Sequence, residues 1–343
     1  MSFIPRVSVG LAVYNGENFV REAIDSILNQ TFTDFELIIT DNASTDRTQA
    51  ICQEYVVKDQ RIRYYRNERN IGGIRNQNLV LSLSRGEYFK LAAHDDICAP
   101  EFLEECVEIL DRDPSVVLSY SRAQIINERG EFFDSDEPYV KYTNAGLQLA
   151  TSLRPQARFR EIACLPHSCQ HIFGVIRMSA LQSIPWWGTY AGSDRSLLAR
   201  LALLGRFEEV PECLFFLRRH SGQSINIGQR SLYLYNIWYC TDNKGRIVLP
   251  GWLMFYEYFM AMRKAPMSWH DRIGCYLRLF GPYLKTDGLR MIKDLIVGTL
   301  QLLDRLYGSL PLPQNVHPQS LEEDLIFGRF PRARRPYKTG LNE

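Results

Sequence analysis

The sequence alternates short apolar runs with amphipathic stretches from its start to about residue 120. The apolar runs have the length of buried strands and lie at 7–13, 35–40, 61–65, 88–93 and 116–120. The clearest helical spacing of apolar residues lies between the first two runs, at 19–28. This alternation predicts an α/β fold, with a doubly wound, mostly parallel sheet flanked by helices.

Polar clusters follow the first four apolar runs. They are Tyr14-Asn15-Gly16-Glu17, the stretch 41–46, the stretch 67–73 and His94-Asp95-Asp96. The carboxyl ends of parallel strands meet at one edge of a sheet, so these clusters are expected to converge there on a ligand. Adjacent carboxylates such as Asp95 and Asp96 suit a hard divalent cation that also binds substrate phosphates. The alternative is that they cap the helix expected after Pro100.

The stretch from 121 to 228 is less regular. Residues 121–155 are rich in charge and turn formers, and we interpret them as an acceptor-side loop. A helix is expected to follow Asp194, and a basic polar loop occupies 218–224. The other expected elements are short helices within 156–184, a strand from His171 to Arg177, and two strands around Pro211, at 207–210 and 214–217.

Beyond residue 228 the pattern is helical and aromatic. Helices are expected at 229–241, 250–263, 269–282 and 287–308. They form a C-terminal helical appendage that either packs on protein or lies on a membrane surface. The chain therefore divides into a sheet domain over 1–228, with halves at 1–122 and 123–228, a helical region over 229–310 and an extended basic tail over 311–343.

Composition narrows the classes of partner and compartment. A net charge of +1 gives no reason to expect nucleic acid as a partner. The eight cysteines are scattered without a CxxC pair, which favours reduced thiols in the cytoplasm. The N-terminus does not look like a signal peptide, and no apolar stretch is long enough to span a bilayer. A cytoplasmic protein, or one peripheral at the inner face of the membrane, is expected.

Taken in order, the four polar clusters resemble the motifs of family 2 glycosyltransferases, which have the GT-A fold. The motifs are Tyr-Asn-Gly-Glu, Asp-Asn-Ala-Ser-Thr-Asp-Arg-Thr, Asn-Ile-Gly-Gly-Ile-Arg-Asn-Gln-Asn and His-Asp-Asp. The resemblance covers roughly residues 5–222. It implies an inverting transferase that uses a nucleotide diphosphate sugar.

The resemblance implies a set of residues for binding the donor. Asp41 matches the acid that accepts the N3–H of uracil or thymine, with Asn42 in the same motif. Asp46 is expected to cap the next helix rather than touch the donor. Arg75 is expected to meet a phosphate or one of Asp95 and Asp96. The full set is Val13, Tyr14, Asn15, Glu17, Asp41, Asn42, Asn70, Gly72, Gly73, Arg75, His94 and Asp95.

The resemblance also implies a metal site. Asp95, its neighbour Asp96 and His220 match the positions expected to hold Mn²⁺ or Mg²⁺. The chain departs from the common pattern, because Ala93 stands where many members carry an acid. Arg218 and Arg219 would add charge against the diphosphate, within a loop expected to order when donor binds.

Asp194 matches the catalytic base, although Ser193 stands where members often have Glu. The competing interpretation is a helix cap. Trp186, Trp187 and Tyr190 either stack on an acceptor sugar or pack in the core.

The expected function is metal-dependent transfer of a sugar from UDP or dTDP to a saccharide or lipid-linked acceptor, in polysaccharide biosynthesis. Peripheral membrane contact or a homodimer through the C-terminal helices is the expected association. One alternative is a sugar nucleotidyltransferase, but the first loop lacks the Lys or Arg that would hold a triphosphate. Another is a non-catalytic binding module, which would not need Asp194. A dehydrogenase is disfavoured, because no GxGxxG follows the first strand.

Overall fold

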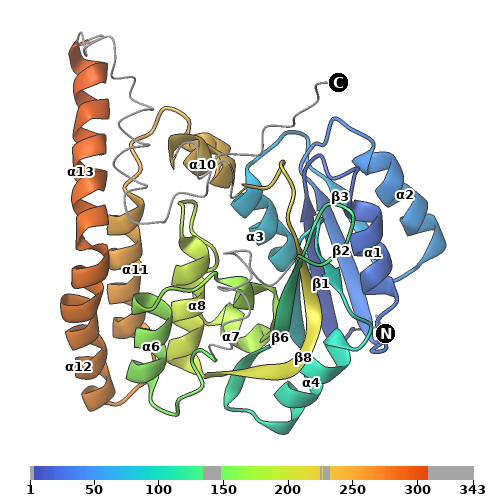
Figure 1. Cartoon of the computed structure of the whole chain (residues 1–343), viewed down its shortest axis with the longest axis horizontal. Coiled ribbons are helices and arrows are strands. Elements are labelled where there is room, and N and C mark those ends of the chain that lie inside the picture. The colour runs from blue at the N-terminus through green and yellow to red at the C-terminus, as the bar shows by residue number, and fades with distance from the viewer. Residues whose placement is uncertain (1–3, 134–147, 225, 227–231, 308–343) are drawn as a thin grey trace, which may run out of the picture.

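The computed structural model describes residues 4–133, 148–224, 226 and 232–307 (Figure 1). Within those ranges the centre of the fold is an eight-stranded sheet with strand order β3-β2-β1-β4-β7-β6-β8-β5. Its strands are β1 (Val7–Val13), β2 (Phe35–Asp41), β3 (Ile62–Arg66), β4 (Tyr88–Ala92), β5 (Ile97–Cys98), β6 (Val116–Ile126), β7 (Val175–Arg177) and β8 (Arg206–Arg218). The predicted doubly wound α/β sheet is confirmed.

Strand direction brings the ends of distant segments to one edge of the sheet. β1 pairs in parallel with β2 and β4, and β2 pairs in parallel with β3. The short β7 is antiparallel to both β4 and β6, and β6 is parallel to β8. The carboxyl end of β8 therefore points the same way as those of β2 and β4, which places the loop after β8 beside the loops after the first strands.

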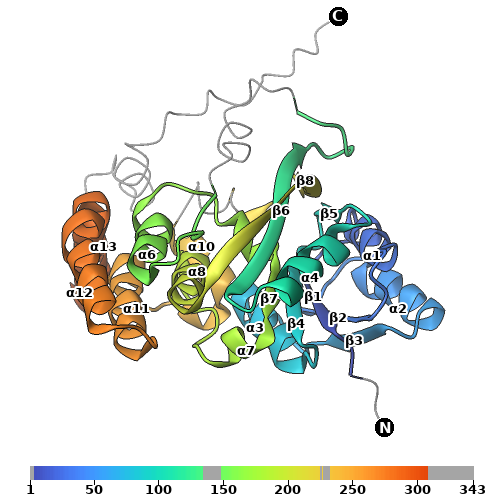
Figure 2. The ribbon, with the colours of Figure 1, turned by 90° about the horizontal axis from the view of Figure 1, so that it is seen from below.

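Helices cover both faces of the sheet (Figure 2). One face packs against α1 (Val20–Leu28), α2 (Thr48–Lys58) and α4 (Phe102–Arg112). The other packs against α3 (Gly73–Leu83), α6 (Pro155–Cys164), α7 (Met178–Gln182) and α8 (Ser193–Leu204). Strand side chains alternate between the two clusters: in β4, Phe89 and Leu91 face the second cluster, and Tyr88 faces the first.

The C-terminal helical elements are α10 (Leu232–Tyr239), the 3-10 turn η2 (Thr241–Asn243), α11 (Pro250–Lys264), α12 (Trp269–Arg278), the π-helical turn η3 (Leu279–Tyr283) and α13 (Leu284–Tyr307). The last three follow one another without a break, where the sequence predicted two separate helices. α11, α12 and α13 lie beyond α6 and α8, at the far side of the molecule from α2, whereas α10 lies beside α3 (Figures 1 and 2). No helix among the described residues is long and apolar enough to cross a membrane. The predicted basic tail lies outside those residues.

Two predicted strands around Pro211 are one strand in the structure. β8 runs from Arg206 to Arg218, and Val210 and Cys213 pair with the consecutive residues Ser121 and Arg122 of β6. Pro211 and Glu212 are therefore bulged out of the ladder, so the missing N–H of proline costs no hydrogen bond. The same pairing extends β6 to Ile126, beyond its predicted end at residue 120.

The predicted strand from His171 to Arg177 is only half strand. Residues 170–173 form a 3-10 turn, η1 (Gln170–Phe173), preceded by Cys169 in the left-handed region, and β7 begins at Val175. The predicted loop over 121–155 begins as part of β6, and residues 134–147 lie outside the described ranges. The helix predicted from Pro100 starts at Phe102, after the unpredicted short strand β5.

Candidate active site

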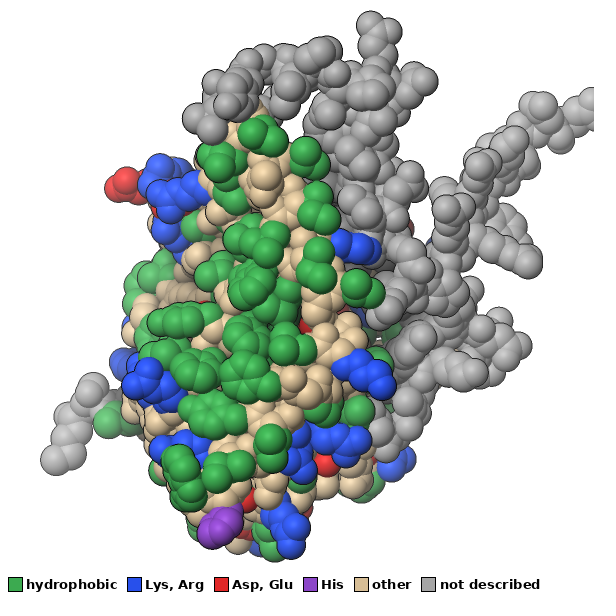
Figure 3. All heavy atoms as spheres, turned by 90° about the vertical axis from the view of Figure 1, so that its left-hand side faces the viewer, with side chains coloured by type: hydrophobic (Ala, Val, Ile, Leu, Met, Phe, Trp, Pro, Cys, Tyr) green, Lys and Arg blue, Asp and Glu red, His purple; other side chains and the backbone are tan. Residues whose placement is uncertain are grey.

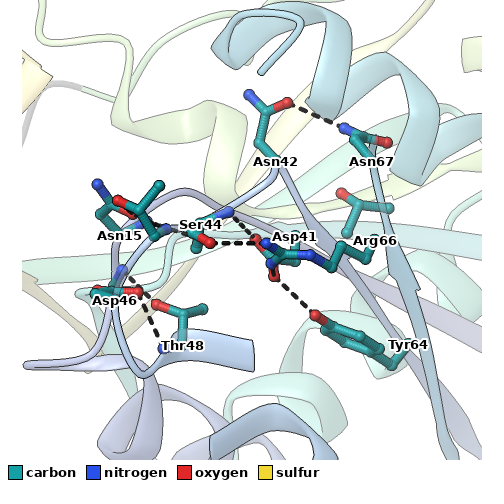
Figure 4. A network of polar contacts seen from close by, with 12 residues as sticks. Asn15, Asp41, Asn42, Ser44, Asp46, Thr48, Tyr64, Arg66 and Asn67 are labelled. Carbon is teal, nitrogen blue, oxygen red and sulfur yellow. Dashed lines mark hydrogen bonds and ion pairs between the residues drawn. The ribbon is translucent and has the colours of Figure 1, made fainter. Parts of the chain in front are cut away.

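The loops after β1 and β2 are tied together by hydrogen bonds (Figure 4). Asn15, in the left-handed region, donates its N–H to Ser44 Oγ, and its side-chain oxygen accepts from Thr45 N. Glu17 Oε2 accepts from Arg47 N at 3.0 Å. Asn15 and Glu17, both predicted to bind the sugar donor, therefore hold the loop after β1 against the loop after β2. Beside them Tyr14 is exposed and Val13 is buried.

Asp46 joins the same two loops and starts α2. Its Oδ2 accepts from Glu17 N and its Oδ1 accepts from Thr48 N, both at 3.0 Å. Burial would raise the pKa of this carboxyl, but these hydrogen bonds outweigh burial and lower it. Asp46 thus binds the N–H of Thr48, the first residue of α2, although the N-cap position itself is Arg47.

Asp41 is completely buried, and both carboxylate oxygens have partners within the chain. Oδ1 accepts from Ser44 N at 2.8 Å, and Oδ2 accepts from Tyr64 OH at 2.7 Å and from Arg66 (Figure 4). A contact between Asp41 and a nucleobase, which stays a prediction, therefore requires one of these partners to move. The sequence analysis did not find Tyr64 and Arg66. The sequence carried no signal for this contact, because Arg66 is placed opposite Asp41 only by the register of β3 with β2.

Asparagine side chains link the loop after β2 to the loop before α3. Asn42 accepts from Asn67 Nδ2 and Ile71 N, and donates to Asn70 Oδ1 at 3.0 Å. Asn70 Oδ1 also accepts from Gly72 N. Of the predicted donor residues, Asn42 and Asn70 thus lie together and order the loop that leads into α3.

The glycines of that loop face another part of the same chain. A Cβ on Gly72 would lie 2.6 Å from Cα of Cys240, and one on Gly73 would lie 3.0 Å from the ring of Trp238. Gly72 also has φ +91°, which disfavours any other residue. Arg75 pairs with Asp242 at 2.6 Å rather than with Asp95 or Asp96. The close approach that these glycines allow is therefore the approach of α10 and η2 to the start of α3.

Asp95 and His220 meet at the sheet edge, from the ends of β4 and β8. His220 Nε2 lies 3.0 Å from Asp95 Oδ2, and Gly222 N donates to His220 Nδ1. That second bond places the proton on Nε2, where it donates to the carboxylate. Burial alone would raise the pKa of Asp95, but the adjacent His94 and the bond from His220 lower it to about 2. Asp95 is thus an anion in the position predicted to hold metal.

Arg218 is fully buried beneath this pair. Its N–H donates to Asp96 Oδ1 at 2.9 Å, its Nε donates to the carbonyl of Asp95, and its Nη2 pairs with Glu22. The guanidinium also lies over the Phe19 ring at 4.8 Å. The prediction that Arg218 faces the diphosphate is wrong, because its donors are used to hold the Asp95-Asp96 turn. Burial and the charge of Asp95 raise the pKa of Asp96 well above its usual range.

The side chains of Asp95 and His220 fit the ligands of a divalent cation that also binds substrate. The described residues contain no cluster of three or more His, Cys, Asp or Glu side chains able to hold a metal by themselves. They do bring together one carboxylate and one imidazole, Asp95 and His220. Mg²⁺ and Mn²⁺ are commonly held by one or two side chains with substrate phosphates completing the shell.

Asp194 lies in the first turn of α8, after Gly192 in the left-handed region. Burial raises the pKa of its carboxyl to about 6, and the polar groups of Trp187 and Tyr239 offset part of the rise. The backbone carbonyl oxygen of Tyr239 lies close to the loop before α3, because a Cβ added to Gly72 would be 2.8 Å from it. Tyr239 therefore lies between Asp194 and that loop.

Two of the three aromatic residues before Asp194 belong to the core. Trp187 and Tyr190 are each 3% exposed, and Tyr190 OH bonds Ser196 and Glu257. The interpretation as core packing is confirmed for these two. Trp186 is partly buried, and its Nε1 donates to the carbonyl of Leu181.

The comparisons with known proteins agree with this architecture. The family model described as "Glycosyl transferase family 2" matches residues 8–184, about half of the chain. An uncharacterized glycosyltransferase of Methanocaldococcus jannaschii is 36% identical over 136 residues, covering 39% of this chain and 47% of the relative. The chondroitin synthase of Escherichia coli is 30% identical over 147 residues, covering 43% of this chain and 21% of the synthase. The chain thus aligns with about half or less of these relatives' lengths.

Solved structures share the fold over most of the chain. S. aureus TarS, solved as residues 1–349 with UDP-GlcNAc, has a TM-score of 0.60 at 16% identity, covering 88% of this chain and 82% of TarS. A mannosyltransferase of Pyrobaculum calidifontis, solved with GDP-Man and Mn²⁺, has a TM-score of 0.50 at 17% identity, covering 90% and 89%.

The fold is therefore that of the GT-A glycosyltransferases. The chain belongs to glycosyl transferase family 2. The family match ends before Asp194 and His220, so the roles of these two residues rest on their geometry.

Proposed function

We propose that the protein is an inverting, metal-dependent glycosyltransferase. It moves one sugar from a nucleoside diphosphate sugar to a hydroxyl of a saccharide or lipid-linked acceptor. The observation that carries this proposal is that two carboxylates implied by the family resemblance have opposite environments. The pKa of Asp95 is lowered to about 2 at the sheet edge, and the pKa of Asp194 is raised to about 6 at the start of α8.

The donor occupies the edge formed by the loops after β1, β2 and β4. Tyr14 is the exposed side chain of the first loop, and the loop from Asn70 to Arg75 borders the ribose and phosphates. Asp95 and His220, together with Asp96, would hold Mn²⁺ or Mg²⁺. Such an ion would supply Lewis-acid neutralisation of the charge on the departing diphosphate. His94 lies next to Asp95 and contacts the donor sugar.

Asp194 acts as the general base. It removes the proton of the acceptor hydroxyl while that oxygen forms a bond to the anomeric carbon. The bond from this carbon to the diphosphate breaks on the opposite face, and its electron pair leaves with the nucleoside diphosphate. One carboxylate suffices, because a single displacement forms no covalent intermediate and inverts the anomeric centre.

The base of the donor is uracil or thymine in this proposal. TarS was solved with UDP-GlcNAc and the P. calidifontis mannosyltransferase with GDP-Man, so a GT-A fold accommodates either kind of nucleotide. The likeness to a chondroitin synthase supports an acceptor of the polysaccharide class, and with it a place in surface polysaccharide assembly. A cytoplasmic site of action follows from a nucleotide sugar donor.

Calorimetry tests the donor and the metal together. We would titrate UDP, dTDP and GDP into the protein, with and without Mn²⁺, and repeat the series with Asp95→Ala. We expect UDP or dTDP to bind only with Mn²⁺, and Asp95→Ala to weaken this binding at least about 100-fold, as loss of a metal ligand does.

The matched control is Glu212→Gln, which removes an exposed carboxylate from the bulge of β8. It should bind the diphosphate like the unmodified protein. The proposal is overturned if no diphosphate binds under any condition, or if Asp95→Ala binds as tightly as Glu212→Gln.

A further inference from the structure

One face of the C-terminal helices is apolar although it is exposed. Along α12 and η3, Trp269, Ile273, Leu277 and Phe280 recur at helical spacing and are 40–68% exposed. The stripe continues along α13, through Leu289, Ile292, Leu295, Ile296, Leu300 and Leu302. Figure 3 shows these helices face-on, with hydrophobic side chains gathered along their whole length. We call this surface the apolar face.

The polarity of α13 is inverted relative to an ordinary surface helix. Its inward side carries the carboxylate Asp294, which is 6% exposed and accepts from Gly251 N at 2.6 Å. Its outward side carries leucine and isoleucine, with Ile292 54% exposed. Because an exposed helix face in water is normally polar, the outward side of α13 is suited to an apolar neighbour.

Aromatic residues of α11 widen the apolar face. Trp252 donates Nε1–H to the carbonyl of Met291 on α13 and is 40% exposed, and Tyr256 is 59% exposed. Phe255 of α11 packs against Phe280 of η3, with ring centroids 5.7 Å apart. Trp and Tyr, which join an apolar ring to a polar group, are the residues enriched where hydrocarbon meets lipid headgroups.

The charges around the apolar face have one prevailing sign. Between residues 250 and 303 the sequence has seven Lys and Arg and four Asp and Glu. Arg263, Lys264 and Lys285 are exposed, whereas each of the four acids is buried or only partly exposed. Cations beside an apolar surface complement the anionic headgroups of a phospholipid bilayer.

We propose that the apolar face lies on an anionic phospholipid membrane, with α12 and α13 parallel to its surface. The helices together offer a stripe about 50 Å long at 1.5 Å per residue. A second copy of the chain fits less well. In a two-fold contact the basic residues of one copy would meet those of the other, and none of the four acids between residues 250 and 303 is exposed to pair with them.

The apolar face is joined to the proposed catalytic turn. A Cβ on Gly192, two residues before Asp194, would lie 3.6 Å from Met254 of α11 and 3.9 Å from Arg290 of α13. The helices that rest on the membrane are thus the ones that pack behind the base. The acceptor is accordingly lipid-linked, its hydroxyl presented close to the headgroups. This last step rests on the proposed function, whereas the membrane contact does not.

Vesicle sedimentation tests the membrane contact. The full-length protein is mixed with phosphatidylcholine vesicles, with or without phosphatidylglycerol, and no nucleotide or acceptor is present. We expect strong sedimentation with the anionic vesicles only. Leu277→Glu and Ile292→Glu each place a carboxylate in the apolar face, and should lower the partition coefficient at least about tenfold. The double change Arg263→Gln, Lys264→Gln should lower it about tenfold or more, for anionic vesicles only.

The matched control is Val57→Glu, a change at an 88% exposed apolar residue of α2, on the other side of the molecule. It should sediment like the unmodified protein. All variants are first compared by far-UV circular dichroism and melting temperature, which should be unchanged at these exposed positions.

Three outcomes overturn the membrane proposal. The first is that the full-length protein sediments with neither kind of vesicle. This outcome overturns the proposal even if a chain shortened to end at residue 307 does sediment with them. The second is that Val57→Glu loses as much binding as Ile292→Glu. The third is that light scattering shows a stable dimer which Ile292→Glu makes monomeric, while the unmodified protein does not bind vesicles. None of these outcomes affects the calorimetric test of donor binding, so either proposal can fail without the other.

Discussion

Asp194 has an environment that opposes its own ionisation. Burial at the start of α8 raises the pKa of its carboxyl to about 6, so a pH near neutrality leaves it deprotonated and still basic. We expect kcat/KM to fall about tenfold per pH unit below about pH 6 and to level off above it, because only the carboxylate accepts the acceptor's proton. Asp194→Asn should lower kcat by a factor of about 10² to 10⁴. A pH-independent residual rate in wild type would contradict this role.

The same environment predicts that Asp194 destabilises the fold at neutral pH. A carboxyl whose pKa is higher in the folded than in the unfolded state binds its proton more tightly when folded. Its contribution to stability is therefore present below the unfolded pKa and is lost as pH rises toward about 6. Asp194→Asn should stabilise the protein by on the order of 1 kcal/mol at about pH 7.5 and by nothing at about pH 4. Thermal melts of both proteins at both pH values measure this difference, and an equal effect at both would exclude the carboxyl as its source.

Arg218 supports the turn that carries Asp95 and Asp96, the residues of the proposed metal site. Arg218→Met keeps the side-chain volume but leaves Glu22 and the carbonyls of Asp95, Asn127 and Glu128 without their donor. We expect a loss of about 3 kcal/mol in urea unfolding. Metal-dependent UDP binding should weaken as well, because the turn that carries Asp95 loses its support.

The comparison for Arg218 is Arg21→Met. Arg21 of α1 pairs with Glu54 of α2 at 2.9 Å, and the two side chains are 44% and 46% exposed. An exposed pair contributes less than about 1 kcal/mol, so this variant should unfold like the unmodified protein. If both variants lost the same free energy of unfolding, the buried Arg218 would contribute no more to stability than an exposed arginine.

Among the elements, α10 depends on the loop before α3. Gly72→Ala would place a Cβ 2.6 Å from the backbone of Cys240, at a residue with φ +91°. We expect a loss of about 2–4 kcal/mol, from backbone strain and displacement of α10. Gly288→Ala in α13 is the control, since nothing lies within 4 Å of a Cβ there. That change should leave the free energy of unfolding unchanged or raise it by up to about 1 kcal/mol, because alanine has the higher helix propensity. Chemical denaturation of both variants provides the measurement.

The strands β1, β2 and β4 could be predicted because each is buried on both faces and so reads as a mostly apolar run. β1 was predicted at its observed bounds, and the α1 helix was predicted from its single apolar stripe. The strand around Pro211 could not be predicted, because a proline breaks a local strand pattern. Only the pairing of β8 with β6 shows that two residues bulge out there.

Some features of the candidate site could likewise be predicted from the sequence, and others could not. The resemblance to family 2 glycosyltransferases predicted that Asp95 and His220 share one site, and they lie 3.0 Å apart. The partners of Asp41 could not be predicted, because Arg66 meets Asp41 through the register of two strands rather than through chain proximity. Arg218 was misassigned for a related reason. An arginine in a basic loop reads as exposed, and only the tertiary structure shows it buried.

At the scale of the whole molecule, the C-terminal helices share a hydrophobic core with the sheet. Tyr258 and Met262 of α11 are completely buried, and the cluster that contains them extends through α6 and α8 to the β4 residues Phe89 and Leu91. Phe159 of α6 meets Tyr258 edge to face, with ring centroids 5.4 Å apart. The apolar face, built on such a core, is held in a fixed orientation to the turn that carries Asp194. The proposed presentation of a lipid-linked acceptor requires such a fixed orientation.

That shared core predicts one cooperative unfolding transition. Phe159→Ala should cost about 3–5 kcal/mol, because it opens a cavity between α6 and α11. Tryptophan fluorescence, which includes Trp252 and Trp269 of the C-terminal helices, should still change together with far-UV circular dichroism. The comparison is Phe132→Ala, at a ring that is 58% exposed, with an expected cost below about 1 kcal/mol. If the fluorescence transition instead separated from the circular dichroism transition, the helices would be a unit of their own. The apolar face could then move relative to Asp194.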